Sequence, residues 1–221
     1  MDYKRPAGGA CPRIEGVRVK ICGITIPGDA RAAEEAGANA IGLIFVRSST
    51  RFVTPEQAGL IRAQVSPLTA VVGVFRDAPL SEVRELAENL RLGAVQLHGS
   101  EPPEYAARLR KRVPVIKAFS FTPELTREEL SSYPADAILL DGAVPGSGTR
   151  FDWSLAGELR GHPHLMLAGG LTARNVGAGV AALRPFAVDV SSGVESSPGF
   201  KDARLMQEFV AAARSPVPAP A

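Results

Sequence analysis

Short apolar runs rich in β-branched residues alternate along this chain with longer segments of helical periodicity. The apolar runs predict strands at 18–22, 40–45, 69–74, 94–97, 115–119, 137–141, 165–168 and 187–190. The intervening segments predict helices at 30–35, 55–64, 80–90, 103–111, 124–131, 154–159, 173–183 and 203–213. Alternating strands and helices imply parallel strands with right-handed crossovers. Eight such units predict an α/β fold, a single (β/α)8 TIM barrel.

The competing architecture is an open doubly wound sheet. Its usual sign is a Gly-x-Gly-x-x-Gly turn after the first strand, but here Cys22-Gly23-Ile24-Thr25 follows. The barrel is therefore favoured. We predict one barrel domain at 17–214, with a flexible N-terminal extension at 1–16 and a flexible tail at 215–221, because both ends are rich in Pro, Gly and Ala.

Composition excludes several classes of partner. The 221 residues are 45% hydrophobic and 22% charged, and 25 basic against 23 acidic residues give a net charge of +2 without a basic stripe. We therefore expect no nucleic-acid partner, and no apolar run approaches the roughly 18 residues that a membrane span needs. Two cysteines, Cys11 and Cys22, form no disulfide framework and fit a cytoplasmic location. No His, Cys, Asp and Glu set has metal-ligand spacing, so no metal is expected.

Two predicted strands end in one ionisable residue followed by glycine. Cys22 ends the first strand, and Asp141 ends the sixth. In α/β barrels this end of the strands carries the catalytic groups, so a thiol and an acid could face one pocket and move a proton between two atoms. Lys20 lies on the same strand face as Cys22, where its charge could favour the thiolate. The alternatives are a small buried thiol and a turn carboxylate.

Glycine turns follow the last two predicted strands. In barrels these loops commonly form a phosphate cradle, where backbone N–H groups meet the anion. Serine hydroxyls could add further donors. The cradle expected here consists of Gly169, Gly170, Ser191, Ser192 and Gly193. The alternative is that these are only tight turns between strands and helices.

Five further residues are candidates. Three of them have both a functional and a structural interpretation, and two have only a structural one. Arg51 follows the second strand and is either solvated or a fork that holds a carboxylate. His98 ends the fourth strand, as an acid/base group or a structural imidazole. Lys117 is either a Schiff-base lysine or an ion-pair partner, for example of a strand-end aspartate. The two histidines that flank Pro163, His162 and His164, are interpreted as solvated loop residues.

Taken together, the chain closely resembles the phosphoribosylanthranilate isomerases, (β/α)8 enzymes of tryptophan biosynthesis, from about Val19 to about Ala213. The resemblance lies in VKICGIT, GLIFV with SSTRFV, VVGVF, VQLHG, IKAF, LLDG with GSGTRFDW, LAGGLTARNV and VDVSSGVESSPGFKD, all in the family's order. It departs from the family at Thr50, where proline is usual, at Arg76-Asp77, where Val-Asn is common, and in the 145–150 loop, which has one glycine fewer.

The resemblance implies a role for each candidate residue. Cys22 is the general base and Asp141 the general acid. The glycines of LAGGL and the SSG segment bind phosphate. Its substrate-binding residues are Arg51, associated with the anthranilate carboxylate, and Asp189 at the ligand. We also expect His98 to bind the substrate.

The implied reaction is the Amadori rearrangement of N-(5-phosphoribosyl)anthranilate to 1-(2-carboxyphenylamino)-1-deoxyribulose 5-phosphate, without a cofactor. It needs a thiolate and a protonated acid, so we expect positive charge to lower the pKa of the thiol. The substrate is the expected partner, and the protein is a monomer or homodimer. Two competitors remain: a Schiff-base lyase that uses Lys117, and a barrel that binds phosphosugars without converting them.

Overall fold

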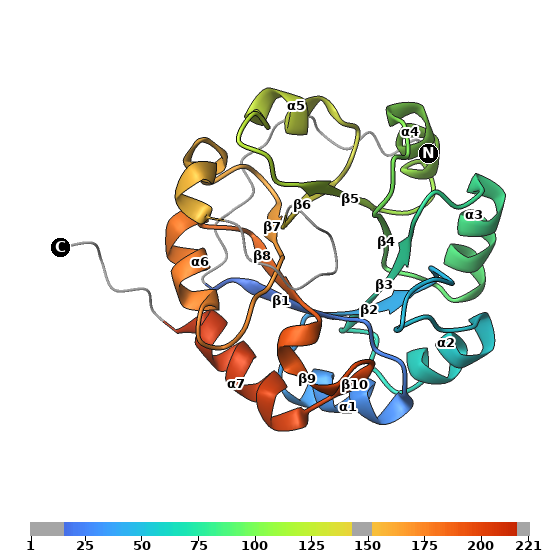
Figure 1. Ribbon diagram of the computed structural model, residues 1–221. Helices are drawn as coiled ribbons and strands as arrows, with labels where there is room; N and C mark the ends of the chain where they lie inside the picture. The colour runs from blue at the N-terminus through green and yellow to red at the C-terminus, as the bar shows by residue number, and fades with distance from the viewer. Residues whose placement is uncertain (1–15, 143–151, 216–221) are drawn as a thin grey trace.

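A computed structural model describes residues 16–142 and 152–215 of the protein. Eight parallel strands, β1 to β8, pair in chain order and close into a barrel when β8 pairs with β1 (Figure 1). The strands are β1 Arg18–Cys22, β2 Ala40–Ile44, β3 Ala70–Phe75, β4 Ala94–Leu97, β5 Val115–Ser120, β6 Ala137–Asp141, β7 Leu165–Leu167 and β8 Ala187–Val190. The predicted (β/α)8 TIM barrel is confirmed, and the open sheet is excluded.

Helices form a ring outside the barrel (Figure 1). They are α1 Pro27–Glu35, α2 Pro55–Arg62, α3 Leu80–Asn89, α4 Pro103–Leu109, α5 Arg127–Ser132, the 3-10 helix η1 Trp153–Leu159, α6 Val176–Leu183, the 3-10 turn η2 Ser192–Val194 and α7 Ala203–Arg214. Each predicted helix is present, although the segment predicted at 154–159 is 3-10 and not α-helical.

Local side-chain hydrogen bonds explain two helix starts that the periodicity placed too early. At α5, the Thr126 side chain accepts from the Glu129 backbone N–H while the Glu129 carboxylate accepts from the Thr126 N–H, so the helix begins at Arg127. Before α6, the Thr172 N–H donates to the Asn175 side chain at 2.8 Å. This local turn delays the helix to Val176.

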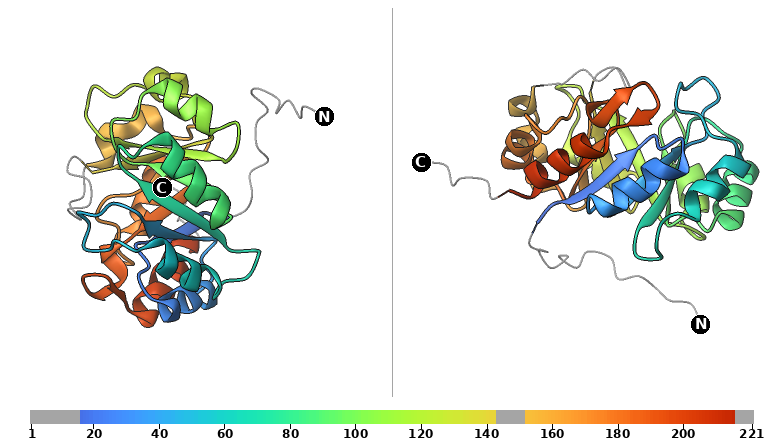
Figure 2. Two further views of the ribbon diagram at one scale, coloured as in Figure 1. Left: turned by 90° about the vertical axis from the view of Figure 1, so that its right-hand side faces the viewer. Right: turned by 90° about the horizontal axis from the view of Figure 1, so that it is seen from below.

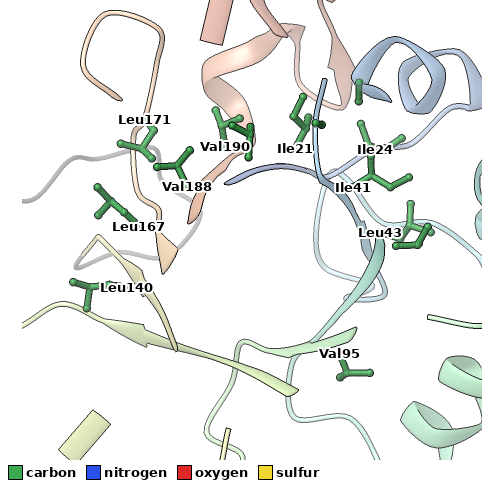
Figure 3. Close-up of a cluster of buried hydrophobic side chains, with 14 of the residues drawn as sticks. Ile21, Ile24, Ile41, Leu43, Val95, Leu140, Leu167, Leu171, Val188 and Val190 are labelled. Atoms are coloured by element: carbon green, nitrogen blue, oxygen red, sulfur yellow. The ribbon is translucent and has the colours of Figure 1, made fainter. Parts of the chain in front are cut away.

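Apolar side chains divide between two layers, as the period of two in a strand requires. The outer layer packs between strands and helices and includes Ile21, Ile41 and Leu43 (Figure 3). A smaller inner cluster fills the barrel with Val72, Ile116, Leu139, Met166 and Ala187 among others. Because Ile21 packs outward, its neighbours Lys20 and Cys22 lie on the inner face of β1.

The carboxyl ends of the eight strands share one face of the barrel, since all the strands are parallel. The chain adds an antiparallel hairpin here, β9 Glu195–Ser197 with β10 Phe200–Lys201. Figure 2 shows it in red on the side toward which the β1 arrow points. Sequence reasoning missed the hairpin, because three- and two-residue strands are too short for alternation to be recognised.

Within the described residues, no helix is both long enough and apolar enough to cross a membrane. The domain limits at 17–214 remain a prediction. Most of the extension, including Cys11, and most of the tail lie outside the described residues.

Candidate active site

A pocket of about 200 Å³ opens at the carboxyl end of the barrel. All ten residues predicted for the site line it: Cys22, Arg51, His98, Asp141, Gly169, Gly170, Asp189, Ser191, Ser192 and Gly193. They come from six different strand ends or loops, so only closure of the barrel brings them together. Apolar side chains from β2 and β3, Ile44 and Val74, complete one wall.

The thiol of Cys22 is packed tightly at the end of β1. The residue is 6% exposed, and a Cβ placed on Gly42 of the neighbouring strand would lie 2.7 Å from the Cys22 Sγ and 3.1 Å from the Lys20 Nζ. No side chain at position 42 could coexist with this arrangement. Gly42 therefore leaves the space in which the thiol and the ammonium group sit together.

Lys20 and Asp189 form an ion pair inside the barrel. They occupy directly paired positions of β1 and β8, and the Lys20 Nζ donates to the Asp189 Oδ1 at 2.9 Å. Burial alone would lower the pKa of Lys20, but the negative charges of Asp189 and of the Cys22 thiolate outweigh it, so the pKa lies above its ordinary value. Lys20 is therefore a permanent cation beside the thiol.

The pKa of the Cys22 thiol is raised, because burial disfavours the thiolate more than Lys20 favours it. The expectation that nearby positive charge lowers this pKa was therefore wrong in its direction. The pKa is raised because the thiol is buried, and the sequence did not reveal this burial. Lys20 and Lys201 still act in the expected sense and reduce the size of the shift.

Asp141 lies beside His98 in the pocket. Its Oδ1 accepts from the Gly142 backbone N–H at 2.8 Å, and its Oδ2 lies 3.4 Å from the His98 Nε2. The His98 Nδ1 is 3.1 Å from the Gln96 side-chain amide. Of the two interpretations of His98, the structure places it in the pocket as the neighbour of the candidate acid.

Backbone shape defines the candidate phosphate loops after β7 and β8. Gly169 and Gly170 have φ angles of +82° and +62°, which side chains rarely adopt. A Cβ on Gly193 would lie 1.9 Å from the Leu171 carbonyl oxygen, so the two loops touch at a point where only glycine fits. The loops therefore form one continuous wall with exposed backbone.

Arg51 reaches the pocket from the loop after β2, and its guanidinium is already held. Its Nε and Nη2 donate to the two carboxylate oxygens of Glu195, both at 2.7 Å. The side-chain stem lies across the backbone of Gly23, where an added Cβ would be 2.5 Å from the Arg51 Cδ. The interpretation of Arg51 as a solvated loop residue is thus excluded.

Lys117 does not line the pocket. It forms the expected kind of ion pair, but with Glu101 at 2.9 Å and not with a strand-end aspartate. Glu101 also accepts from the backbone N–H groups of Asp77 and Gly99, so the cluster ties the β3 and β4 loops together. This arrangement gives Lys117 a structural role.

The expectation that His162 is solvated was wrong. It is only 8% exposed, it lies 3.1 Å from the Ser131 hydroxyl, and burial lowers its pKa. His164 is partly buried, and its Nδ1 lies 3.0 Å from the Asp136 carbonyl oxygen. Polarity around Pro163 indicated a loop correctly but could not show that the loop folds back onto α5.

Sequence reasoning missed several residues of the site region, among them Gln96, Glu195 and Lys201. Gln96 could have been found, because it lies two residues before His98 and so on the same strand face. Glu195 and Lys201 gave no usable signal, since they belong to the unexpected hairpin. Among the described residues, no three of His, Cys, Asp and Glu gather closely enough to hold a metal ion. The loop at 145–150, which has one glycine fewer than the family pattern, lies outside the described residues.

A closed (β/α)8 barrel with a thiol, a carboxyl group and two glycine-lined loops at its carboxyl end has the design of a barrel enzyme that handles small phosphorylated molecules. Residues 19–212 match the family model for N-(5'-phosphoribosyl)anthranilate (PRA) isomerase. The chain belongs to this family of isomerases.

Individual relatives agree with the family model. The N-(5'-phosphoribosyl)anthranilate isomerase of Pelobacter propionicus is 43% identical over 202 residues, which cover 90% of this chain and 96% of that protein. The enzyme of Geobacter sulfurreducens is 46% identical over 202 residues, covering 90% and 98%. A crystal structure of the Thermotoga maritima enzyme superposes with a TM-score of 0.85 at 42% identity, covering 90% of this chain and 98% of that one.

Proposed function

We propose that this protein catalyses the Amadori rearrangement of N-(5-phosphoribosyl)anthranilate to 1-(2-carboxyphenylamino)-1-deoxyribulose 5-phosphate in tryptophan biosynthesis. The observation that carries the proposal is the convergence of Cys22, Asp141, Arg51 and the glycine loops on one pocket. A related enzyme has been crystallised with the reduced form of this product. The pocket offers a base, an acid and two anion sites, which are the groups that the substrate requires.

Asp141, in its protonated form, opens the sugar ring. It donates its proton to the ring oxygen while the C1–O bond breaks and the nitrogen lone pair forms a C1=N double bond, which gives a protonated Schiff base. The Gly142 N–H and His98 fix the direction of the carboxyl group. Asp141 finishes this step as a carboxylate.

Cys22, as thiolate, then removes the proton from C2. The electrons of the C2–H bond move toward the cationic nitrogen and form an enolamine, in which C1 and C2 share the double bond. Transfer of the O2 proton to C1 gives the ketone. The substrate's own nitrogen accepts the electrons, so no cofactor takes part in these steps. The enzyme is left with a thiol and a carboxylate, and a net proton transfer from Cys22 to Asp141 resets it.

Lys20 stabilises the thiolate that this cycle requires. The raised pKa of Cys22 makes the thiolate scarce at neutral pH, yet a scarce, desolvated thiolate is a strong base. The permanent positive charge of Lys20 limits the energetic cost of forming it. A cationic Schiff base in the same pocket favours the thiolate further.

The two charged ends of the substrate bind to two separate groups of residues in the pocket. Arg51 binds the ring carboxylate, and the loops with Gly169, Gly170 and Ser191 to Gly193 bind the phosphate. Asp189, held by Lys20, and His98 contact the sugar, which lies between the carboxylate and the phosphate of the substrate.

The oligomeric state is part of the same proposal. The chain is a monomer or a homodimer, and a related Thermotoga maritima enzyme is described as dimeric.

The test is an assay of the purified protein with N-(5-phosphoribosyl)anthranilate, whose fluorescence falls as it is converted. The matched control is the Cys22→Ala, Asp141→Asn double variant, purified in the same way, which reports any contaminating activity. Turnover by the natural protein alone supports the proposal. Equal rates in both preparations, or no conversion by a folded natural protein, would contradict it.

A barrel that only binds phosphosugars predicts affinity without conversion in this assay. The Schiff-base alternative predicts a covalent adduct at Lys117 after treatment with borohydride. The ion pair of Lys117 with Glu101, outside the pocket lining, argues against such an adduct. Mass spectrometry of the treated protein distinguishes this outcome from the proposed isomerase.

A further inference from the structure

Glu195 forms the centre of a charged cluster that connects the two anion sites. It accepts from the Arg51 Nε and Nη2 at 2.7 Å each and from the Lys201 Nζ at 2.8 Å. The Lys201 Nζ also donates to the Ser191 carbonyl oxygen at 3.1 Å and lies 3.4 Å from the Ser191 hydroxyl. The side chains of Glu195 and Lys201 are 5% and 0% exposed, so water contributes little to these contacts.

The contact with Glu195 uses one particular edge of the Arg51 guanidinium. A guanidinium has five N–H donors, and Glu195 takes one from Nε and one from Nη2. The donors that remain are both on Nη1 and one on Nη2. One N–H of Nη1 and the free N–H of Nη2 form the terminal edge of the group, which can hold a second carboxylate bidentately.

We propose that Glu195 is a positioning residue, which holds Arg51 so that its terminal edge faces the pocket and receives the aromatic carboxylate of the substrate. The inference rests on the proposed function, because it concerns the group to which Arg51 binds. Through Lys201, Glu195 also fixes Ser191 in the candidate phosphate loop. The distance between the carboxylate and phosphate sites is thus set by one buried chain of contacts.

The charges of the cluster suit this role. Arg51 and Lys201 together contribute two positive charges, and Glu195 cancels one, so the cluster keeps one positive charge for a ligand anion. Burial would raise the pKa of Glu195, but hydrogen bonds from Arg51 and Lys201 outweigh it and hold the pKa below its ordinary value. Glu195 is therefore ionised whenever the enzyme works near neutral pH.

The stem of Arg51 is fixed as well as its head. It crosses Gly23, where an added Cβ would lie 2.5 Å from the Arg51 Cδ and 3.0 Å from the Ser191 Oγ. The guanidinium therefore has little freedom to compensate if Glu195 loses its charge. Loss of that charge also leaves Lys201 and Arg51 as neighbouring cations without the anion between them.

If Glu195 competed with the substrate instead of positioning Arg51, its substitution would change the affinity in the opposite direction. If Glu195 competed with the substrate carboxylate for Arg51, removal of its charge would free the guanidinium and tighten binding. If it positions Arg51, the same change weakens binding, although the pocket becomes more positive. The sign of the change in affinity therefore decides between the two.

The experiment measures binding by calorimetry, so that it does not depend on turnover. The ligands are reduced 1-(o-carboxyphenylamino)-1-deoxyribulose 5-phosphate and the same molecule without its ring carboxylate. The proteins are the natural enzyme, Glu195→Gln, Arg51→Met and the double variant. Glu208→Gln is the matched control, because Glu208 forms an exposed ion pair with Arg204 on α7.

We expect Glu195→Gln to weaken binding of the carboxylate-bearing ligand by about tenfold or more, because charge-assisted hydrogen bonds are lost. The affinity for the carboxylate-free ligand should fall much less. In the Arg51→Met background, Glu195→Gln should no longer change the ratio of the two affinities. Glu208→Gln should leave both affinities unchanged.

Tighter binding of the carboxylate-bearing ligand by Glu195→Gln would overturn the proposal, as would equal losses for both ligands. If Glu195→Gln does not fold, Glu195→Asp provides the second variant, which keeps the charge but shortens its reach. Glu195→Asp should lose less affinity than Glu195→Gln, and only for the carboxylate-bearing ligand. A natural enzyme that binds both ligands but converts no substrate would contradict the proposed function and leave the role of Glu195 intact.

Discussion

The Lys20 ammonium group and the Asp189 carboxylate lie 2.9 Å apart across the seam where β1 and β8 close the barrel. Cys22 follows Lys20 on the same face of β1, and Asp189 lines the pocket. The ion pair therefore serves both the closure of the sheet and the electrostatics of the candidate base. A buried pair of this kind tolerates the loss of one partner poorly.

Lys20→Met should destabilise the fold by about 3–5 kcal/mol, because Asp189 is left buried without its counter-ion. Urea unfolding followed by circular dichroism gives the free energy of unfolding. Adding Asp189→Asn should recover a large part of that loss, since the unpaired charge is then gone. A double variant no more stable than Lys20→Met would show that the pair contributes through packing and not through charge.

Activity should rise with pH above neutrality, because the pKa of Cys22 is raised and the base is the thiolate. Below that pKa, kcat/KM should increase about tenfold per pH unit, until protonation of the acid becomes limiting. The increase of kcat/KM with pH does not by itself show which residue titrates. The alkylation rate of Cys22 by iodoacetamide, measured in the Cys11→Ser variant, should rise over the same pH range and fall when product analogue is bound. Alkylation independent of pH from 7 to 9 would count against the raised pKa.

Asp141→Asn keeps the shape of the side chain but removes its transferable proton. We expect kcat to fall by roughly two to four orders of magnitude while product-analogue affinity changes little. Steady-state kinetics with a parallel binding titration separates the two effects. Near-normal turnover in a folded variant would move the acid role elsewhere, and His98 is then the first residue to test.

Gly193→Ala should weaken phosphate binding, because the new Cβ would lie 1.9 Å from the Leu171 carbonyl oxygen and force the two loops apart. The expected result is an increase of about tenfold or more in the inhibition constant of inorganic phosphate. Gly59→Ala is the matched control, since a Cβ there meets nothing within 4 Å. An unchanged constant in Gly193→Ala would place the phosphate elsewhere.

His162 should make stability fall as the pH drops below about 6.5, the ordinary pKa of histidine. Burial lowers the pKa of His162 in the folded state, so between the folded and unfolded pKa values the unfolded chain binds more protons. The stabilising contribution is present above pH 6.5 and is lost as the pH falls through the folded pKa. His162→Gln should reduce the change in Tm between pH 7 and pH 5. An identical pH dependence in the variant would exclude this source.

The sequence by itself determined the fold, because the hydrophobic periodicity of strands and helices is a local property, and it recurs in eight successive units. It also indicated Cys22 and Asp141, since a strand end followed by glycine places a side chain at the rim of a barrel whatever the rest of the chain does. All ten predicted site residues line one pocket, because strand ends and the loops that follow them lie at the same end of a parallel barrel. Their roles rest on the family resemblance and on the experiments above.

Only the tertiary structure decided how these groups affect one another. The depth of Cys22 reverses the expected direction of its pKa shift, and desolvation depends on neighbours from other strands, such as Gly42. Glu195 lies 144 residues from Arg51 in sequence but accepts both of its hydrogen bonds through a hairpin too short to predict. Burial and long-range pairing are properties of the closed barrel, and no local pattern of residues contains them.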